Sequence, residues 1–300
     1  MEWSFVETGK YEVFLQVAEM GNLTHAAESL GYTQSAVSRI ITDLEKEWKV
    51  QLLLRGRNGA RLTTAGEQML PRIRAVCHAQ QELEEQVGHL HGLTFGTVRI
   101  GSFPSASIQW LPKIIKSFQV KYPNIQFEVV THTEYRGIEE MIEEGRVDCG
   151  FIALPCSGDL ETIFLRRDRH MAVLPEDHPL AKSKSYPISR FAEDPFIKLE
   201  DDRDQEVQEI LEHYHVKPNI RYKGNNDYAI MSLVENGLGV SALTELVLQR
   251  TPFHVAIRPL DPPQFREIGI AVRSFDELSP TARRFVDYVE ECFKTEDSER

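Results

Sequence analysis

Apolar side chains recur every three or four residues through the first part of the chain, which is the spacing of amphipathic helices. This pattern predicts a helix from about Gly9 to Met20, followed by two short helices separated by a tight turn at Gly31. A residue that ends a helix in this way usually has positive φ, which glycine adopts without strain. The buried face of the two short helices is predicted to consist of Leu23, Ala26, Ala27, Leu30, Val37, Ile40, Ile41 and Leu44.

The two short helices have the features of a helix-turn-helix. Ala26 and Ala27 allow them to approach closely at the sharp crossing that this motif requires. The second helix, which Thr33 is placed to cap, begins with short hydrogen-bonding side chains and a guanidinium that suit base edges and phosphates in a major groove. The alternative interpretation is an αα-hairpin in a helical core, since motif matches carry false positives. The candidate DNA contacts here are Thr33, Gln34, Ser35, Ser38 and Arg39.

Residues 50–62 contain two short apolar segments on either side of Asn58-Gly59, which is the strongest short signal for a β-hairpin. A hairpin directly after a recognition helix is the wing of a winged helix. Its arginines, Arg55, Arg57 and Arg61, are predicted to lie near DNA phosphates or the adjacent minor groove. On its own, the same segment would be interpreted as a hairpin with a solvated basic edge.

A long helix is predicted from Thr63 or Thr64 to about His91, with Pro71 bending its first turns. Its apolar positions alternate in steps of four and three residues, which is the heptad seam of a coiled coil. A seam without a partner in the same chain favours pairing with a second copy, which also brings two recognition helices onto a palindromic site. The alternative is a buried helix of the following domain. The seam consists of Met69, Ile73, Val76, Gln80, Leu83, Val87 and Leu90.

Beyond a predicted hinge at residues 91–96, strands and helices alternate, which indicates an α/β architecture with a parallel sheet. Two sets of these elements predict two lobes joined by crossing segments, with a ligand cleft at the carboxyl ends of the strands. The predicted strands are residues 97–101, 125–131, 149–153, 169–174, 196–198, 219–223, 240–243 and 266–273. The predicted helices are residues 108–122, 135–144, 205–215, 227–236 and 280–293.

The net charge of −12 runs against the basic footprint that is usual for DNA-binding proteins. Between Gly31 and Arg74, however, eight lysines and arginines stand against four acidic residues, so the acidic excess lies elsewhere. Because the Debye length at physiological salt is about 8 Å, that distant acid is largely screened. The chain has four scattered cysteines without CxxC spacing, which indicates reduced thiols in a cytoplasmic protein. Its N-terminal segment is acidic, unlike a signal peptide, and no apolar run is long enough to span a membrane.

From about Tyr11 to Glu290, the chain resembles the LysR-type transcriptional regulators. Each matching segment is short, but their order and spacing together are specific. Thr244 stands where the family commonly has proline. The matching segments are Gln34-Ser35-Ala36-Val37-Ser38-Arg39-Ile40, Arg61-Leu62-Thr63-Thr64-Ala65-Gly66, Tyr122-Pro123, Gly145-Arg146-Val147-Asp148-Cys149-Gly150, His178-Pro179-Leu180-Ala181 and Leu233-Val234-Glu235-Asn236-Gly237-Leu238-Gly239-Val240.

The resemblance implies an N-terminal winged helix-turn-helix over residues 1–65, a dimerising linker helix over 66–92 and an α/β effector-binding domain over 93–300 that is similar to periplasmic binding proteins. It further implies a homotetramer, formed as a dimer of dimers, that controls transcription from a pseudo-palindromic operator in response to a small molecule. RNA polymerase is an additional expected partner, and no cofactor is expected. The two lobes are expected at about residues 93–163 with 267–300 (lobe I) and at about 164–266 (lobe II).

Free N–H groups and hydroxyls where a strand passes into a helix form a ready anion site, and the family often holds an effector carboxylate there. Acidic residues between Glu200 and Asp204, together with Asp227, favour an amine if any of them points inward. An amino-acid-like effector would satisfy both features. Alternatively, these polar side chains only cap helices and turns. The candidate effector contacts are Ser102, Ser105, Ser107, Thr131 and Thr133 in lobe I, and Lys198, Arg203, Asn225 and Asn226 in lobe II.

The sequence contains no GxSxG, HExxH, P-loop or GxGxxG motif, so the chain is predicted not to be an enzyme. Its close histidine pairs, His89 with His91 and His213 with His215, have a two-residue spacing that puts the rings on different helix faces, which disfavours a metal site. Two other functions stay open: a solute-binding protein, which has no use for residues 1–65, and a constitutive DNA-binding repressor whose second domain binds no ligand. A ligand-dependent change in DNA affinity would exclude the constitutive repressor.

Overall fold

The structure is a computed structural model that describes residues 9–56, 59–90, 95–200 and 204–298. Contacts between Cα atoms divide the chain near residue 93 into an N-terminal unit and a C-terminal unit, and each unit has a hydrophobic core of its own. Within the described residues, no helix combines the length and the apolar composition needed to cross a membrane.

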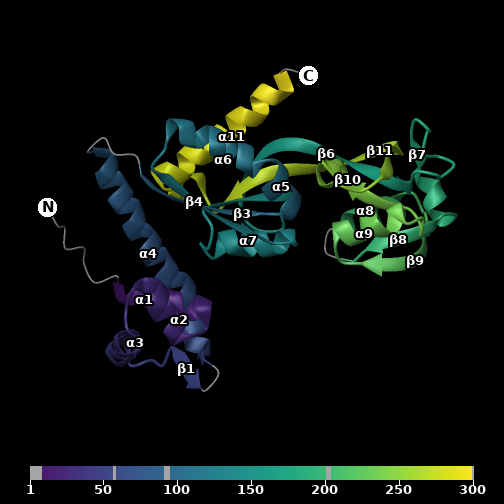
Figure 1. The fold of residues 1–300 in the computed structure, drawn as a ribbon. Helices are drawn as coiled ribbons and strands as arrows, with labels where there is room; N and C mark the ends of the chain where they lie inside the picture. Colours follow the sequence, from purple (N-terminus) through teal and green to yellow (C-terminus); the bar gives the residue numbers. More distant parts are fainter. Residues whose placement is uncertain (1–8, 57–58, 91–94, 201–203, 299–300) are drawn as a thin grey trace. The chain divides into compact units, whose positions relative to one another are not determined.

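Three helices build the core of the N-terminal unit, as the apolar spacing predicts: α1 (Gly9–Met20), α2 (Leu23–Leu30) and α3 (Gln34–Trp48) (Figure 1). Gly31 ends α2 with a φ of 69°, and Thr33 Oγ1 accepts a hydrogen bond from the first turn of α3 at 3.2 Å. The helix-turn-helix prediction is therefore confirmed. The buried side chains that join the three helices include Phe14, Val17, Ala26, Ala27, Val37, Ile41 and Leu44.

The predicted hairpin is present, but Gly59 lies in a strand rather than in the turn. β1 (Leu53–Gly56) pairs antiparallel with β2 (Gly59–Leu62), so the connecting residues are 57–58, which lie outside the described residues. Glycine is required at position 59 by a close approach, because a Cβ there would lie 2.3 Å from the carbonyl oxygen of Gly21. The hairpin is thus packed against the turn between α1 and α2.

The long helix α4 spans Thr64–Leu90, and Thr63 caps it by accepting a backbone hydrogen bond at 3.0 Å. The predicted seam along this helix divides into two parts. Met69 and Ile73 pack into the core of the N-terminal unit, so the first part of the seam serves the unit itself. The exposed part begins further along the helix, with Val76, Leu83 and Val87 at 46%, 61% and 37% exposure.

The C-terminal unit is organised around a seven-stranded sheet with the strand order β10-β6-β11-β5-β3-β4, and β7 pairs with β11. The βαβαβ segment β3–β5 forms parallel pairs, as predicted. The sheet as a whole is mixed, because β6 and β11 cross between the two halves of the unit as an antiparallel pair. The strands are β3 (Gly96–Ser102), β4 (Ile125–Thr131), β5 (Cys149–Leu154), β6 (Glu161–Pro175), β7 (Tyr186–Pro187), β10 (Ser241–Thr244) and β11 (Val255–Val272).

The long strands β6 and β11 run through two lobes (Figure 1). Lobe I surrounds β3, β4 and β5, and its helices are α5 (Pro104–Gln109), α6 (Leu111–Lys121), α7 (Tyr135–Glu143), η2 (Phe275–Glu277) and α11 (Pro280–Ser298). Lobe II surrounds β10 and the parallel pair β8 (Pro195–Leu199) and β9 (Asn219–Gly224). Its helices are η1 (Ile188–Ala192), α8 (Asp204–His213), α9 (Asp227–Glu235) and α10 (Glu245–Leu248).

The single helix predicted over residues 108–122 is wrong, because the structure has two helices, α5 and α6, in this region. Trp110 separates them with φ of −106° and ψ of −56°. Pro112 lies at the start of α6, where its missing N–H and fixed φ are tolerated, whereas a continuous helix would place it in the interior.

Candidate functional sites

The start of α3 presents the predicted polar residues to solvent. Thr33, Gln34, Ser35 and Arg39 are exposed, and the Arg39 side chain is 85% exposed with its Nε 3.7 Å from Asp43. A pair of exposed i, i+4 charges contributes little to stability, so Arg39 can leave Asp43 at low cost. The face therefore combines small hydrogen-bonding groups with an available guanidinium, as base edges and phosphates require.

Arg55 of the wing lies across α3. Its Nη1 donates to Ser38 Oγ at 2.8 Å, and its Nη2 donates to Thr42 Oγ1 at 2.9 Å. The same Nη2 lies 3.4 Å from Glu45 Oε2. Two predicted DNA contacts, Arg55 and Ser38, are thus brought into direct contact with each other. Of the other wing arginines, Arg61 is exposed and Arg57 lies outside the described residues.

Glu45 connects α3 to the start of the wing, a role that the sequence did not reveal. Its Oε1 accepts hydrogen bonds from the backbone N–H groups of Leu52 and Leu53 at 2.8 and 3.0 Å. Both leucines are buried, so the carboxylate supplies acceptors at a place that water does not reach freely. An acidic residue late in a helix usually faces solvent, which is why no local signal distinguishes Glu45.

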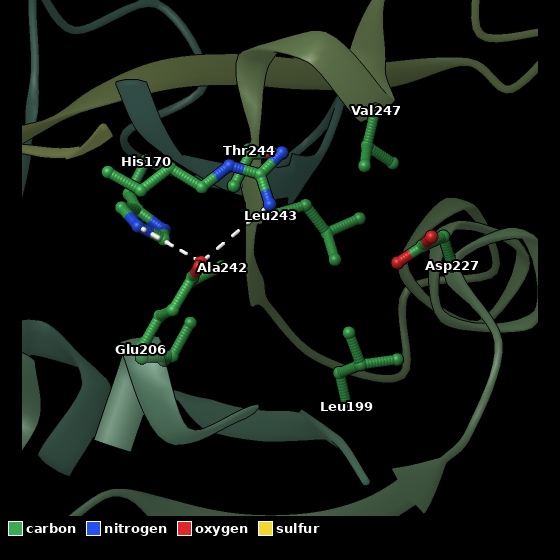
Figure 2. Close-up of a pocket in the computed structure, with 10 residues that line it drawn as sticks. His170, Leu199, Glu206, Asp227, Ala242, Leu243, Thr244 and Val247 are labelled. Carbon is green, nitrogen blue, oxygen red and sulfur yellow. Dashed lines mark hydrogen bonds and ion pairs between the residues drawn. The ribbon is translucent and has the colours of Figure 1, made fainter. Parts of the chain in front are cut away.

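The C-terminal unit contains a pocket in lobe II beside the crossing strands (Figure 2). About 20 Å³ of it can hold the centre of a water molecule, and the space amounts to about 280 Å³ with the part that is continuous with solvent. Aliphatic side chains and three charged side chains share its wall. The lining residues are His170, Leu199, Glu206, Val207, Asp227, Ala242, Leu243, Thr244, Val247 and Arg266.

Arg266 of the pocket wall is buried, with 6% of its surface exposed. Its Nε and Nη2 donate to Asp168 Oδ2 at 3.0 and 2.7 Å, and Nη2 also donates to Thr244 Oγ1 at 2.9 Å. From lobe I, the Tyr135 hydroxyl accepts a hydrogen bond from Nη1, and the guanidinium lies 5.1 Å from the centre of the Phe103 ring. Burial opposes the charge, but the Tyr135 oxygen and the nearby carboxylates outweigh it and raise the pKa of Arg266. Arg266 is therefore a permanent cation that contacts both lobes.

Glu206 faces Arg266 and His170 across the pocket (Figure 2). Its Oε2 lies 3.8 Å from Arg266 Nη1 and 3.6 Å from His170 Nε2, and both distances exceed the hydrogen-bond range. Burial, together with the charge of Arg266, lowers the pKa of His170 to about 3, so the imidazole is neutral at physiological pH. Asp227, at the start of α9, directs its carboxylate into the same space (Figure 2).

The predicted effector contacts of lobe I lie near one another but outside this pocket. Ser107 Oγ and Thr131 Oγ1 are 3.2 Å apart, so the structure brings α5 against the end of β4. Ser102 and Ser105 are buried, and the Ser105 hydroxyl has no hydrogen-bond partner in the described part of the chain. Thr133 is exposed.

Of the predicted contacts of lobe II, Lys198, Asn225 and Asn226 are not part of the pocket wall. Asn226 caps α9 by accepting a hydrogen bond at 2.9 Å, which is the capping role left open as the alternative. Lys198 is partly buried and Asn225 is exposed, whereas Arg203 lies outside the described residues. Among the described residues, no group of three or more histidine, cysteine or acidic side chains could hold a metal ion.

Sequence reasoning missed His170, Glu206 and Arg266, since each belongs to an element whose local pattern shows only strand or helix. Thr244 carried a signal, because the resemblance to the LysR-type regulators predicts proline at this position. A proline could not offer Arg266 the hydroxyl that Thr244 provides.

The fold and these two sites define a winged-helix DNA-binding unit joined to a two-lobed ligand-binding unit. The family model described as "Bacterial regulatory helix-turn-helix protein, lysR family" matches residues 9–67, and the one described as "LysR substrate binding domain" matches residues 91–294. The chain belongs to the LysR family of transcriptional regulators. It is thus a DNA-binding regulator with an effector-binding domain, and the prediction that it is not an enzyme is confirmed by a family that is not enzymatic.

Similar proteins align with nearly the whole chain. The uncharacterized HTH-type transcriptional regulator YvbU of Bacillus subtilis is 32% identical over 289 residues, which are 95% of this chain and 98% of that protein. The transcriptional dual regulator GltC of the same organism is 28% identical, over 96% of this chain and 98% of that protein. A full-length OxyR variant from Pseudomonas aeruginosa shares the fold with a TM-score of 0.76 at 20% identity, covering 97% of this chain and 96% of that one. Full-length CbnR in complex with its target DNA gives a TM-score of 0.56 at 20% identity, and the match covers 95% of this chain and 99% of that one.

Proposed function

We propose that the start of α3 reads base edges in the major groove while the wing contacts the adjacent backbone. The exposed polar face of α3, held on a core of three helices, is the observation that carries this proposal. The contact between Arg55 and Ser38 supports it, because the wing is fixed in register with the recognition helix. The proposed DNA contacts are Thr33, Gln34, Ser35, Ser38, Arg39, Arg55, Arg57 and Arg61.

The exposed part of α4 supports self-association through residues 66–91. Val76, Leu83 and Val87 follow heptad spacing on a helix that leaves them in solvent, and a second copy of the helix would bury them. A dimer of this kind presents two recognition helices to a pseudo-palindromic operator, and two dimers form the proposed homotetramer. In this organisation, residues 1–65 bind DNA, residues 66–92 link and dimerise, and residues 93–300 sense the effector.

The proposed effector site lies between the lobes, beside Arg266. This residue contacts Phe103 and Tyr135 of lobe I and Thr244 of lobe II, so a ligand bound next to it can alter how the lobes are held together. The five lobe I candidates, at the ends of β3 and β4, in α5 and just after β4, are the proposed contacts for an effector carboxylate. The Ser105 hydroxyl, which has no hydrogen-bond partner among the described residues, supports this assignment.

Cys77 and Cys149 are not proposed as redox-sensing thiols. Burial and the nearby Glu12 carboxylate raise the pKa of Cys77 to about 11, and burial raises the pKa of Cys149. A reactive thiol needs the opposite shift. Because a transcriptional regulator must reach the chromosome and RNA polymerase, we place its action in the cytoplasm.

The test is fluorescence anisotropy with the promoter region beside the protein's own gene and a scrambled duplex of equal length. At about 150 mM salt, we expect a preference of about 10³-fold or more for the promoter. Arg39→Ala should weaken binding to the promoter about 10- to 100-fold, whereas Arg283→Ala, an exposed arginine of α11, should not. Equal affinity for both duplexes across the gene's upstream region, or full affinity of Arg39→Ala, would contradict the proposed recognition surface.

A further inference from the structure

Two hydroxyls of the recognition helix accept hydrogen bonds from the same arginine of the wing. Arg55 Nη1 donates to Ser38 Oγ at 2.8 Å, and Arg55 Nη2 donates to Thr42 Oγ1 at 2.9 Å. A guanidinium contains only donors, so the direction of both hydrogen bonds is fixed even though hydroxyl hydrogens rotate. Each hydroxyl therefore uses a lone pair on Arg55 and keeps its own proton for another acceptor.

The two hydroxyls differ in where that proton goes. Thr42 Oγ1 donates to the backbone oxygen of Ser38 at 2.8 Å, one helical turn earlier, so its proton is used within α3. Within the described part of the chain, the Ser38 hydroxyl donates to no atom. Ser38 is partly exposed and lies on the same face of α3 as Gln34, four residues earlier. The proton of Ser38 is thus available to DNA.

Arg55 is held in its position more firmly than an ordinary surface arginine. Its side chain is 34% exposed, and its Nη2 also lies 3.4 Å from Glu45 Oε2. The other oxygen of Glu45 accepts hydrogen bonds from two backbone N–H groups at the start of the wing, which fixes the carboxylate in turn. Arg39, by contrast, is 85% exposed and lies 3.7 Å from Asp43. Leaving Ser38 would break contacts to two hydroxyls and a carboxylate, so we expect Arg55 to remain beside Ser38 on DNA.

A hydroxyl that accepts a hydrogen bond from a cation becomes a stronger donor, because linked hydrogen bonds polarise one another. Arg55 and Ser38 together present N–H and O–H donors and a positive charge, which repel an incoming amino group. In the major groove, guanine offers the acceptors N7 and O6, adenine offers N7 and thymine offers O4. The amino groups of cytosine and adenine are the donors. Ser38 therefore suits an acceptor atom of a base better than an amino group.

We propose that Arg55 is a positioning residue that makes Ser38 a hydrogen-bond donor, so that Ser38 reads an acceptor atom on one base of each half-site. The proposal rests on the proposed DNA recognition by α3 and specifies the chemistry that one side chain reads. A DNA phosphate offers acceptors of the same kind. The two sources differ in their consequence, because a base contact creates a preference at one position, whereas a phosphate contact strengthens binding to all sequences.

The experiment begins with selection of a randomised duplex library by the full-length protein, followed by anisotropy with the selected duplex and its single-base variants at about 150 mM salt. Ser38→Ala should lose about tenfold of the base preference at one position per half-site and keep the preferences elsewhere. Ser38→Thr, which retains the hydroxyl, should retain the preference. Equal weakening of all sequences by Ser38→Ala would indicate a phosphate contact and overturn the base contact.

Modified bases at that position separate the acceptor from the amino group of the same base pair. The acceptor is removed by guanine or adenine that lacks N7, or weakened by sulfur in place of guanine O6 or thymine O4. One of these changes should weaken binding by the wild type about tenfold and leave binding by Ser38→Ala unchanged. Methylation of the amino group should leave both affinities unchanged. Weakening of the wild type alone by this methylation would overturn the donor role of Ser38.

The role of Arg55 is tested by its own substitutions. Arg55→Met should relax the same position as Ser38→Ala, and Arg55→Lys, which retains a cationic donor, should preserve part of the preference. If Arg55→Met lowers affinity for all sequences but keeps the preference, Arg55 contacts phosphate and does not position Ser38. Thr42→Val is the matched control, because its hydroxyl also accepts from Arg55 but has no proton left for DNA, and it should retain the preference. Selection that enriches no sequence with the wild type would overturn the proposed DNA recognition itself.

Discussion

The recognition surface of the N-terminal unit and the pocket of the C-terminal unit are built over very different sequence distances. Arg55 reaches Ser38, Thr42 and Glu45, which are 17, 13 and 10 residues away. Arg266 reaches Asp168 and Tyr135, which are 98 and 131 residues away. The first site follows from helical spacing and one hairpin, whereas the second exists only when strands β6 and β11 pair in the correct register. This difference predicts where substitutions destabilise the protein and where they alter binding.

The largest expected effect is at the buried ion pair between β6 and β11. Arg266→Met leaves the Asp168 carboxylate buried without its partner, which should lower the free energy of unfolding by about 3–5 kcal/mol. Equilibrium urea unfolding followed by circular dichroism measures the change. The neighbouring pair on the same two strands, Arg167 with Glu267, is a matched control, because its side chains are 67% and 45% exposed. Arg167→Met should lower the free energy of unfolding by less than about 1 kcal/mol. A decrease as large as that of Arg266→Met would contradict the predicted difference between the buried and the exposed ion pair.

The next effect concerns Glu45 and the start of the wing. Glu45→Ala removes the acceptor of two buried backbone N–H groups, Leu52 N and Leu53 N, and should destabilise the wing by about 1–3 kcal/mol. Hydrogen exchange at these two amides should accelerate by about tenfold or more, since about 1.4 kcal/mol corresponds to tenfold. Glu45→Gln keeps an acceptor oxygen and should have a smaller effect.

Glu47→Ala is the control for the wing prediction, because this exposed carboxylate of the same helix pairs with Lys10 and touches no wing amide. It should leave exchange at Leu52 and Leu53 unchanged. If the Leu52 and Leu53 amides exchanged at the same rate in Glu45→Ala and in the control, the hydrogen bonds of Glu45 would not stabilise the wing.

A third effect is the pH dependence that the buried His170 imposes. Its pKa falls from 6.5 to about 3 on folding, so between these values the unfolded chain binds a proton that the folded chain does not. Stability must therefore decrease as the pH falls, by about 1 kcal/mol between pH 6.5 and about pH 5.5. His170→Gln should remove this contribution to the pH dependence of the free energy of unfolding. His213→Gln, at an exposed position of α8, should retain it. A wild-type slope in His170→Gln, measured by urea unfolding at each pH, would show that His170 titrates normally.

The sequence predicted the N-terminal unit almost residue by residue, because its signals are local. Gly31 and Thr33 take the backbone roles that their residue types favour, and the helical spacing shows which side chains of α3 face solvent. Gly59 and Glu45 were exceptions, since their roles depend on Gly21 and on the amides of Leu52 and Leu53, which lie elsewhere in the sequence.

In the C-terminal unit, the order of elements was predictable but the pocket was not. Periodicity places Arg266 in a strand without showing that Asp168 lies opposite it. The register of β6 and β11 depends on the packing of both lobes, and no local pattern contains that information. Of the acidic residues that the sequence marked as candidates for an amine, Asp227 lines the pocket, whereas Glu200 is exposed and pairs with Lys223 at 2.6 Å.

The smallest effect on stability is expected at Ser105, which lies in the C-terminal unit, as Arg266 does. Its buried hydroxyl has no hydrogen-bond partner in the described part of the chain, so Ser105→Ala removes an unsatisfied group and should change the free energy of unfolding by less than about 0.5 kcal/mol. Ligand binding should test the proposed carboxylate site of lobe I. The Tm response to norvaline, an α-amino acid with a short aliphatic chain, should decrease in Ser105→Ala, because the substitution removes a hydroxyl that can donate to the carboxylate. Ser117→Ala, at an exposed position of α6, should leave this response unchanged. A full norvaline response in Ser105→Ala would remove Ser105 from the proposed carboxylate site.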